Sequence, residues 1–498
     1  MNVETSVATA TNSRKIFGQP AGLTVLATTE LWERFSFYGM RAILVLYLTA
    51  GLSQAGSAGP GLGLDAGAAA AIYGSYLALV YVTPIGGGWI ADRVVGARRA
   101  VLIGGIVIAS GHFSMALPTE ISFWLGLLLI ALGTGLLKPS ISAMVGELYR
   151  GSTQTRQDAG FSIFYMGINI GAFLAPLLVG SLAAIKGWHW GFALAGIGMC
   201  VALIIYIAGR RTLGDAGNKP RNPVPTRELE KVVVAALAGI GIFVMVAAGV
   251  GVSRGDFIQG VATTLAWTVV LIALIYIWRM FHRSRIRYTE RERSRLKGFM
   301  YLFVLSIFFW MIFDQAGSTL TIFAQNWTSR DIGAWEMPAA WLQSLNPIMI
   351  IIFAPIFAWL WIKLANRAPS VPLKFAIAIV GMGLSFVILV IPGISADDKA
   401  MSAVWWLVVA YLIQTWSELL LSPTGLSAAC TLAPQGMTSQ VLALWFLSTA
   451  IGDAVGGQIL DAISGRGFAF IFAFFGILAL VVGSLALAFV KPVKRLIA

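Results

Sequence analysis

Long apolar runs alternate with short polar segments along almost the whole chain. About twenty apolar residues in a helix are enough to cross a bilayer. Counting such runs predicts six spans, an extra pair and then six more. The first six are expected near residues 22–50, 66–91, 98–117, 122–148, 158–185 and 187–208. The extra pair is expected near 230–252 and 258–281, and the last six near 298–326, 337–363, 371–393, 401–432, 437–463 and 466–490.

These runs divide the chain into two six-helix bundles with a hairpin inserted between them. The expected segments are a cytoplasmic tail at 1–21, a bundle at 22–209, a cytoplasmic linker at 210–229, the hairpin at 230–281, a basic cytoplasmic linker at 282–297, a bundle at 298–490 and a cytoplasmic tail at 491–498. The fold class is therefore an all-α polytopic membrane protein with fourteen spans. The hairpin has no charge in its apolar cores, so we expect it to face lipid.

The two bundles repeat each other weakly. The motif Trp32-x-x-Phe35-x-x-x-Gly39 recurs as Trp310-x-x-Phe313-x-x-x-Gly317, and further echoes follow in the same order. Two similar six-span halves around a central site are the architecture of carriers that work by alternating access.

Composition agrees with a membrane location. Hydrophobic residues make up 58% of the 498 positions and charged residues only 11%, whereas soluble domains are about 25% charged. In a soluble chain the net charge of +13 would suggest a nucleic-acid partner. Here Lys and Arg lie mainly in short loops, which is typical of topology signals and contacts with anionic lipid.

The basic loops fall on alternate connections and predict which way the chain is oriented. They share one side with both tails, and their residues are Arg14, Lys15, Arg93, Arg98, Arg99, Arg150, Arg156, Lys363, Arg367, Lys491, Lys494 and Arg495. The positive-inside rule then places both termini in the cytoplasm. Residues 1–21 lack an apolar core, so no cleavable signal peptide is expected. Cys200 and Cys430 lie in apolar runs, where inert thiols are expected.

The first span carries an unusual stripe of charge. Glu30, Glu33, Arg34 and Arg41 fall on one helical face. Each charge at the bilayer centre costs about 2.5–3.5 kcal/mol, so the stripe must face a wet cavity or pair across the bundle. An interfacial amphipathic helix is the alternative, but the segment continues as an apolar run through residues 43–48. We expect a substrate or proton pathway here.

A second buried cation lies in the fourth span. Lys138 precedes Pro139 in a glycine-containing stretch, and about ten helical residues follow before Arg150. This position disfavours a lysine that reaches out to the membrane surface. The ammonium group needs a carboxylate, and Glu30 or Glu33 is the expected partner.

The second half offers acids where the first offers bases. Asp314 and Glu418 are buried carboxylates in the seventh and tenth spans, opposite Arg34, Arg41 and Lys138. A short zwitterion spanning the halves would place its carboxylate on the basic groups, with Arg34 well suited to bidentate binding. Its ammonium would meet Glu418.

Other side chains can complete such a site. Aromatic rings can form permissive side-chain pockets, at Tyr38, Tyr81, Trp310 and Trp445. Histidines (His112, His189 and His282) are absent from the first, second, fourth, seventh and tenth spans. Proton coupling is therefore expected to depend on buried carboxylates.

Several motifs resemble those of the proton-dependent oligopeptide transporter (POT) family, a branch of the major facilitator superfamily. They are Glu30-x-x-Glu33-Arg34-Phe35-x-Phe37-Tyr38-Gly39, Gly87-Gly-Trp-Ile-Ala-Asp92-Arg93-x-x-Gly96-x-Arg98-Arg99 and Phe164-Tyr165-x-x-Ile168-Asn169-x-Gly171. Segments around Asp314, Asn346, Glu418 and Trp445 are also similar to the family's. The chain departs from the family at Phe37, usually Tyr, and at Asp314, usually Glu.

The resemblance implies a proton-coupled symporter that imports di- and tripeptides across a bacterial inner membrane, works as a monomer and needs no cofactor or metal. It implies proton coupling by Glu30, Glu33, Arg34, Lys138 and Asp314. Peptide binding would involve Arg34, Tyr38, Tyr81, Lys138, Asn169, Trp310, Asn346, Glu418 and Trp445. Gates would form between Arg41 and Asp314 outside and between Lys138 and Glu418 inside, with Asp92 locking helix ends across the two halves.

Two alternatives stay open. The same scaffold could carry another small anion or zwitterion, such as nitrate or a modified amino acid. A membrane-embedded enzyme would need a catalytic cluster, and no span contains His pairs, a Ser-His-acid set or acids at metal-binding spacing.

Overall fold

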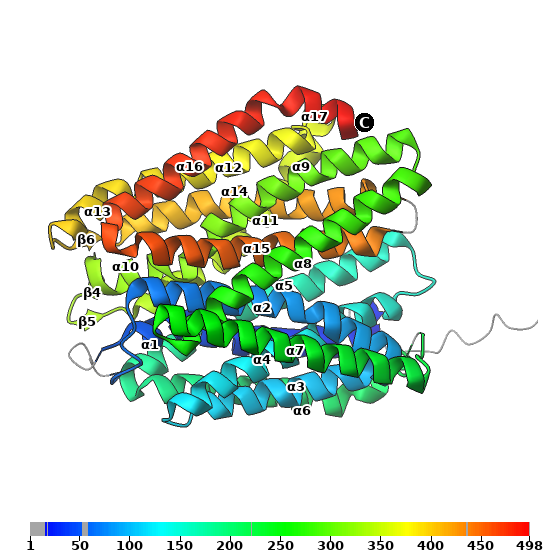
Figure 1. The fold of residues 1–498 in the computed structure, drawn as a ribbon, viewed down its shortest axis with the longest axis horizontal. Helices are drawn as coiled ribbons and strands as arrows, with labels where there is room; N and C mark the ends of the chain where they lie inside the picture. Colours follow the sequence, from blue (N-terminus) through cyan, green and yellow to red (C-terminus); the bar gives the residue numbers. More distant parts are fainter. Residues whose placement is uncertain (1–14, 17, 52–57, 221, 435–436, 498) are drawn as a thin grey trace, which may run out of the picture.

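The computed structural model describes residues 15–16, 18–51, 58–220, 222–434 and 437–497. Most of the expected N-terminal tail, including Arg14, lies outside these ranges. Helices run roughly parallel through the described part, and three short strand pairs (β1–β2, β3–β6 and β4–β5) lie in connections (Figure 1). The all-α prediction is correct.

The N-terminal half contains six long helices at the expected positions. They are α1 (Ala21–Thr49), α2 (Ala66–Ile90, continued by η2, Ala91–Val95), α3 (Ala97–Met115), α4 (Glu120–Leu148), α5 (Gln154–Lys186) and α6 (Trp188–Gly209). Local sequence explains their ends. Asp65 caps α2 by accepting a hydrogen bond from the Ala68 amide. Gly187, with φ of 111°, makes the turn between α5 and α6 that a residue with a Cβ would resist.

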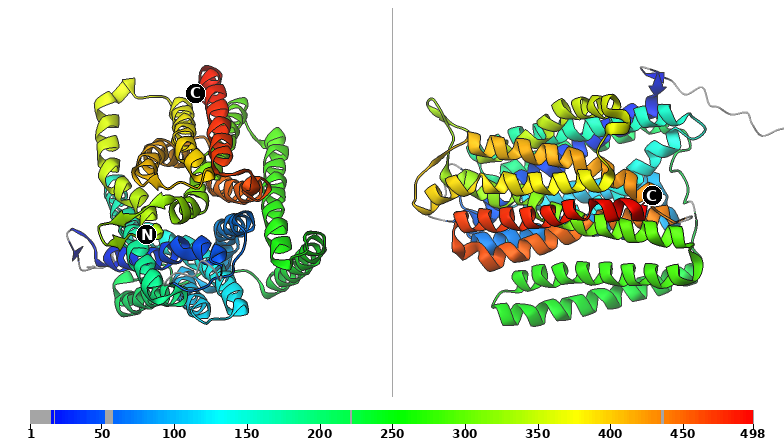
Figure 2. Two further views of the ribbon diagram at one scale, coloured as in Figure 1. Left: turned by 90° about the vertical axis from the view of Figure 1, so that its left-hand side faces the viewer. Right: turned by 90° about the horizontal axis from the view of Figure 1, so that it is seen from above.

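The inserted hairpin lies on the outside of the bundle. After η3 (Arg210–Leu213) it consists of α7 (Thr226–Arg254) and α8 (Phe257–Arg287), joined at Gly255. Figure 2 shows it standing apart on one flank, with α8 nearer the bundle. The Ser75 hydroxyl donates to the Ala262 carbonyl at 2.9 Å, which ties α8 to α2. Apolar side chains of α7 are largely exposed, as expected for a helix that faces lipid.

The C-terminal half repeats the six-span pattern with more breaks. Its elements are α9 (Glu290–Phe313), η4 (Asp314–Gly317), α10 (Thr319–Trp327), β3 (Thr328–Ser329), β4 (Asp331–Ile332), β5 (Trp335–Glu336), η5 (Ala339–Ser344), α11 (Leu345–Leu364), η6 (Ala365–Arg367), α12 (Val371–Val387), α13 (Val390–Asp397), β6 (Ser402–Ala403), α14 (Trp405–Thr431), α15 (Thr438–Ile463), η7 (Ser464–Arg466), α16 (Phe468–Ala488) and α17 (Val490–Ile497).

Two boundaries differ from the prediction. The expected linker at 282–297 is mostly helical, because α8 extends to Arg287 and a capping box between Thr289 and Glu292 starts α9 at Glu290. Charged residues hid these helix ends from a count of apolar runs. The seventh span is also broken at η4, which the apolar pattern did not indicate.

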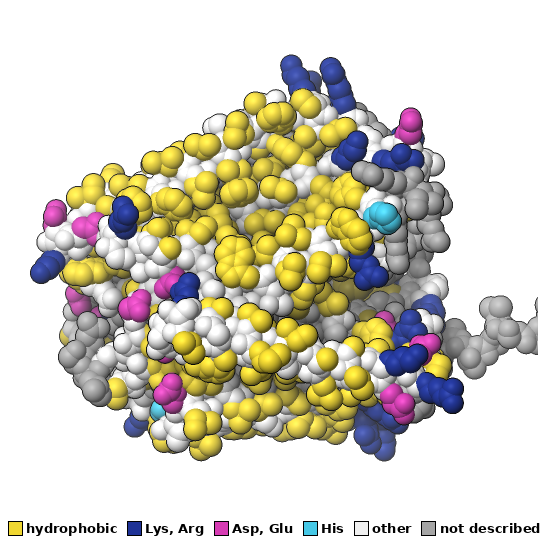
Figure 3. Space-filling model, in the orientation of Figure 1, with side chains coloured by type: hydrophobic (Ala, Val, Ile, Leu, Met, Phe, Trp, Pro, Cys, Tyr) yellow, Lys and Arg dark blue, Asp and Glu magenta, His cyan; other side chains and the backbone are white. Residues whose placement is uncertain are grey.

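The surface is that of a polytopic membrane protein. Among the described residues, eleven helices are long and apolar enough to cross a membrane by length and composition. The charged stripe keeps α1 from meeting that criterion, and α3 and α14 also fall outside it. An apolar belt lies between two ends that carry the charged side chains (Figure 3), and Lys and Arg gather mainly at one of them.

The halves pack against each other most closely where α2 meets α15. A Cβ on Gly74 would lie 2.3 Å from the Asp453 carbonyl oxygen, and one on Gly457 would lie 2.7 Å from that of Ala70. Only glycine permits this approach of two helix backbones. This close approach of α2 and α15 joins the two halves.

Candidate functional site

A cavity of about 250 Å³ lies between the two halves. Helices α1, α2, α4 and α5 form one wall, and the opposite wall comes from α9, η4, η5, α11, α14 and α15. Most of the predicted site residues line it: Tyr38, Arg41, Tyr81, Lys138, Asn169, Trp310, Asp314, Asn346, Glu418 and Trp445. Glu30, Glu33, Arg34 and Asp92 are not among its lining residues.

The charged stripe of α1 is satisfied within its own helix. Arg34 donates from Nη2 to Glu33 at 2.7 Å and from Nε to its other carboxylate oxygen at 2.5 Å, and Nε lies 3.3 Å from Glu30. The three side chains are at most 4% exposed. In this structure Glu33 occupies the fork of Arg34, so the expected bidentate contact between Arg34 and a substrate carboxylate would have to displace Glu33.

The Phe that replaces the family's Tyr also contacts this cluster. The Arg34 guanidinium lies 5.1 Å from the centre of the Phe37 ring, close enough for a cation–π contact. This contact uses the face of the ring and does not need the hydroxyl that a tyrosine would add.

Lys138 is the cation that faces the cavity without an ionic partner. Its ammonium lies 4.8 Å from the centre of the Tyr81 ring, and it forms no ion pair within the described part of the chain. The expected pair with Glu30 or Glu33 is absent, because Arg34 holds both carboxylates. One oxygen of Glu30, Oε2, is nevertheless buried without a hydrogen-bond donor among the described residues.

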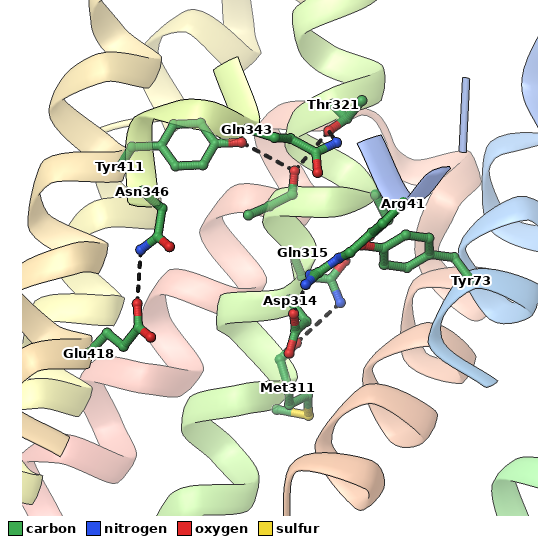
Figure 4. A network of polar contacts seen from close by, with 12 residues as sticks. Arg41, Tyr73, Met311, Asp314, Gln315, Thr321, Gln343, Asn346, Tyr411 and Glu418 are labelled. Carbon is green, nitrogen blue, oxygen red and sulfur yellow. Dashed lines mark hydrogen bonds and ion pairs between the residues drawn. The ribbon is translucent and has the colours of Figure 1, made fainter. Parts of the chain in front are cut away.

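One end of the cavity is bonded shut. Arg41 donates from Nη2 to Asp314 and from Nε to the Tyr73 hydroxyl, each at 2.5 Å (Figure 4). The break at η4 turns the chain so that Asp314, although shorter than the family's usual Glu, reaches the arginine. A Cβ on Gly317 would clash with the Tyr73 hydroxyl, so glycine is needed beside this contact.

Further hydrogen bonds join the halves at this same end. Helix α5 and the end of α1 bond to η5: Gln343 Nε2 donates to the Ala42 carbonyl at 3.3 Å, Trp341 Nε1 to the Ser181 hydroxyl at 2.9 Å, and the Ser344 hydroxyl to the Phe173 carbonyl at 2.8 Å. We call the end that carries these bonds and the Arg41–Asp314 pair the bonded end.

At the opposite, unbonded end, no described lining residue forms a hydrogen bond or ion pair across to the other half. Glu418 accepts a hydrogen bond from Asn346 at 2.8 Å, within its own half (Figure 4). The expected Lys138–Glu418 gate is therefore not formed. Asn169 likewise donates within its own helix, to the Tyr165 carbonyl at 3.0 Å.

Asp92 does not lock the halves together in this structure. Its side chain is exposed and forms no hydrogen bond or ion pair with the described residues. Its backbone carbonyl accepts a hydrogen bond from the Asn222 amide at 3.0 Å, in the linker after the N-terminal half. The lock is missing because the two halves are joined at the other end.

Sequence analysis missed Asp453 on α15. This side chain is 3% exposed and lines a second, very small cavity together with Asp314 and Tyr73. Its sequence signal was the same one that singled out Asp314 and Glu418, namely a lone carboxylate within an apolar run.

Comparisons with known proteins agree on one family. The model of the POT family matches residues 98–469. The uncharacterized transporter YclF of Bacillus subtilis is 40% identical over 98% of this chain and 97% of its own length. A di-/tripeptide transporter of Lactococcus lactis subsp. cremoris is 38% identical over 97% of each chain. The crystal structure of a peptide transporter POT in complex with sulfate is 42% identical, with a TM-score of 0.90 over 97% of each chain.

Proposed function

Because the chain belongs to the POT family of transporters, we propose that it is a proton-coupled symporter that imports di- and tripeptides by alternating access. The single observation that carries this proposal is the cavity between the halves, with a free ammonium group on one wall and a carboxylate on the other. As a member of this family it is a transporter rather than an enzyme and needs no cofactor.

Lys138 and Glu418 would bind the two ends of the peptide. The Lys138 ammonium faces the cavity without an anion, so it can receive the substrate carboxylate. Glu418, held by Asn346, can receive the substrate ammonium. The rings of Tyr38, Tyr81, Trp310 and Trp445, which line the space between, would tolerate varied side chains.

The cluster around Arg34 would couple peptide to proton. Glu30 and Glu33 carry two negative charges when ionised, and Arg34 and Lys138 carry two positive charges. A substrate carboxylate that binds Lys138 neutralises its positive charge, so the group then has one excess negative charge. A proton on Glu30, whose Oε2 has no donor, would restore neutrality, because a buried uncompensated charge is costly.

Rocking of the halves would then exchange the two ends of the cavity. The Arg41–Asp314 pair would break as the bonded end opens, and Lys138 would approach Glu418 as the other end closes. Among the described lining residues, bonds across the halves are made at one end only, which fits a state in which the cavity is accessible from the unbonded end.

We further propose that the protein works as a monomer in a bacterial inner membrane with both termini in the cytoplasm. Both described ends of the chain, β1 (Lys15–Ile16) and α17, lie at the same end of the molecule (Figure 2). A reporter fused after Ala498 and one inserted near Asn218 should both report cytoplasm. A periplasmic signal from either would contradict the orientation.

Counterflow of labelled dialanine in proteoliposomes tests the transport proposal. Purified protein should exchange external labelled dialanine for internal unlabelled dialanine and should accumulate it when a proton gradient is imposed. Exchange of nitrate or a modified amino acid without dialanine would favour the alternative cargo on the same scaffold. Chemical conversion of dialanine would point to an enzyme.

A further inference from the structure

Behind the Arg41–Asp314 pair lies a second carboxylate that the transport scheme does not use. Asp453 is on α15, and both of its carboxyl oxygens are buried without a hydrogen-bond donor among the described residues. The Oδ2 atom of Asp314 is in the same condition. The two side chains line one small cavity between α2, α15 and the break at η4, so they face each other.

Charge at this place does not balance if both acids are ionised. Arg41 supplies one positive charge, and its hydrogen bonds go to Asp314 and Tyr73. Besides Asp314, the titratable side chain that lines this cavity with Asp453 is the phenol of Tyr73 on α2, which carries no positive charge. Asp461, two turns further along α15, is paired with Arg254 at 2.7 Å. One negative charge is therefore left over in a buried site.

A proton is the cation that fits the space. The cavity between the two acids is about 10 Å³, close to the smallest volume that holds a single water molecule. A hydrated metal ion would need more room and more oxygen ligands. Two buried carboxyl groups that line one small cavity can hold one proton between them, because ionising both would place two like charges together in a buried site.

We propose that Asp314 and Asp453 together hold one proton while this end of the cavity is closed, forming a proton site separate from the Glu30–Glu33 cluster. The shared proton leaves one negative charge to pair with Arg41, and it allows one O–H···O hydrogen bond between the two carboxyl groups, which would partner two of the three unpartnered oxygens. Loss of this proton places two carboxylates against one arginine, which loosens the contact between the halves. The proton site itself does not depend on the proposed function. Only its effect on transport rests on that function, in which this contact opens.

Infrared spectroscopy of the purified full-length protein tests the site without any transport. A protonated carboxyl group absorbs apart from ionised carboxylates. The wild type should show a protonated-carboxyl signal near neutral pH, and Asp453→Asn should lose one carboxyl equivalent of it. Asp314→Asn should lose the same equivalent, because Asp453 would then ionise beside Arg41. The double variant should lose no more than either single variant.

Asp461→Asn is the matched control, since it removes a carboxylate on the same helix that already has an ionic partner. It should keep the wild-type signal. An unchanged signal in Asp453→Asn would overturn the proposal. A carboxylate signal that shifts when sodium replaces choline in the buffer, with no protonated band, would overturn it in favour of a metal cation.

Dialanine counterflow across a pH series adds a functional measurement. If the pair loses its proton at alkaline pH, the closed end of the wild type should loosen and dialanine exchange should fall. Asp453→Asn carries the same charge as the protonated pair, so its exchange should not fall at alkaline pH. The same alkaline fall in wild type and variant would contradict a role in gating. If wild type exchanged no dialanine, the proposed function would fail, and the infrared result would still decide the proton site.

Discussion

The two ends of the cavity contain similar chemistry in different states. At the bonded end, Arg41 meets Asp314 across the halves at 2.5 Å. At the unbonded end, Lys138 and Glu418 are also a base and an acid on opposite halves, but they are not paired, and Glu418 bonds to Asn346 instead. The difference teaches that an acid and a base on opposite halves are in contact at one end of the cavity and apart at the other in the same structure.

The consequence for binding is direct. Charges that are paired across the halves are not available to a substrate, whereas unpaired ones are. Lys138 and Glu418 are therefore free for a peptide in the state described here, and Arg41 and Asp314 are not. Four experiments test this contrast between the ends.

Fixing the bonded end should have the largest effect. A Cβ on Gly180 would lie 2.7 Å from the Cβ of Ala340, somewhat closer than the spacing of about 3.8 Å typical of disulfides. The double variant Gly180→Cys/Ala340→Cys should lose all dialanine uptake when oxidised, because this end can no longer open. Reduction should restore uptake.

Each single cysteine variant, still containing Cys200 and Cys430, is the control for this cross-link. Dialanine binding to the oxidised double variant should persist, since the cavity is reached from the other end. Full uptake by a protein shown by mass spectrometry to be cross-linked would break the comparison.

Removing a charge from the coupling cluster should abolish accumulation. Glu33→Gln frees the fork of Arg34, and Lys138→Ala removes the cavity ammonium; either change upsets the balance of two acids and two bases. Uphill uptake driven by a proton gradient is the measurement. Undiminished accumulation in both variants would exclude this cluster as the coupling element.

Neutralising the unbonded end's acid should weaken peptide binding. Truncating one partner of a buried charge pair costs about 2–5 kcal/mol, so Glu418→Gln should lower dialanine affinity by roughly thirty-fold to several thousand-fold. The substrate ammonium would then find amide oxygens that can accept a hydrogen bond but no counter-charge.

Calorimetry with dialanine and with N-acetyl-dialanine separates binding from structure. The acetylated ligand lacks the ammonium, so its already weak binding should change little in Glu418→Gln. Equal losses for both ligands would mean that Glu418 supports the structure and does not recognise the amino terminus.

The smallest effect is expected at the bonded end when its acid is lengthened. Asp314→Glu adds one methylene and brings in the family's usual residue, so the pair with Arg41 should persist and dialanine uptake should be retained. Asp314→Asn, which keeps the length but removes the charge, is the contrasting variant. A greater loss in Asp314→Glu than in Asp314→Asn would show that reach matters more here than charge.

The sequence by itself determined which segments are long and apolar enough to cross the membrane and which buried charges are candidates for function. Apolar runs of bilayer length placed the spans because backbone groups in lipid must be satisfied within helices. Burying a charge in the membrane is also costly, and this cost singled out Glu30, Lys138, Asp314 and Glu418. The same rule applies to Asp453, which is a lone carboxylate within an apolar run.

The tertiary structure alone decided which of these charges meet. Glu33 binds Arg34 and leaves Lys138 without an anion, whereas Arg41 pairs with a residue 273 positions away. Nor does spacing along the chain reveal that Asp453 faces Asp314. Such contacts depend on how glycine-lined helices pack and on where a span breaks, as at η4. Those features follow from the assembled bundle, because a helix sets the direction of its own side chains but not the helix that it faces.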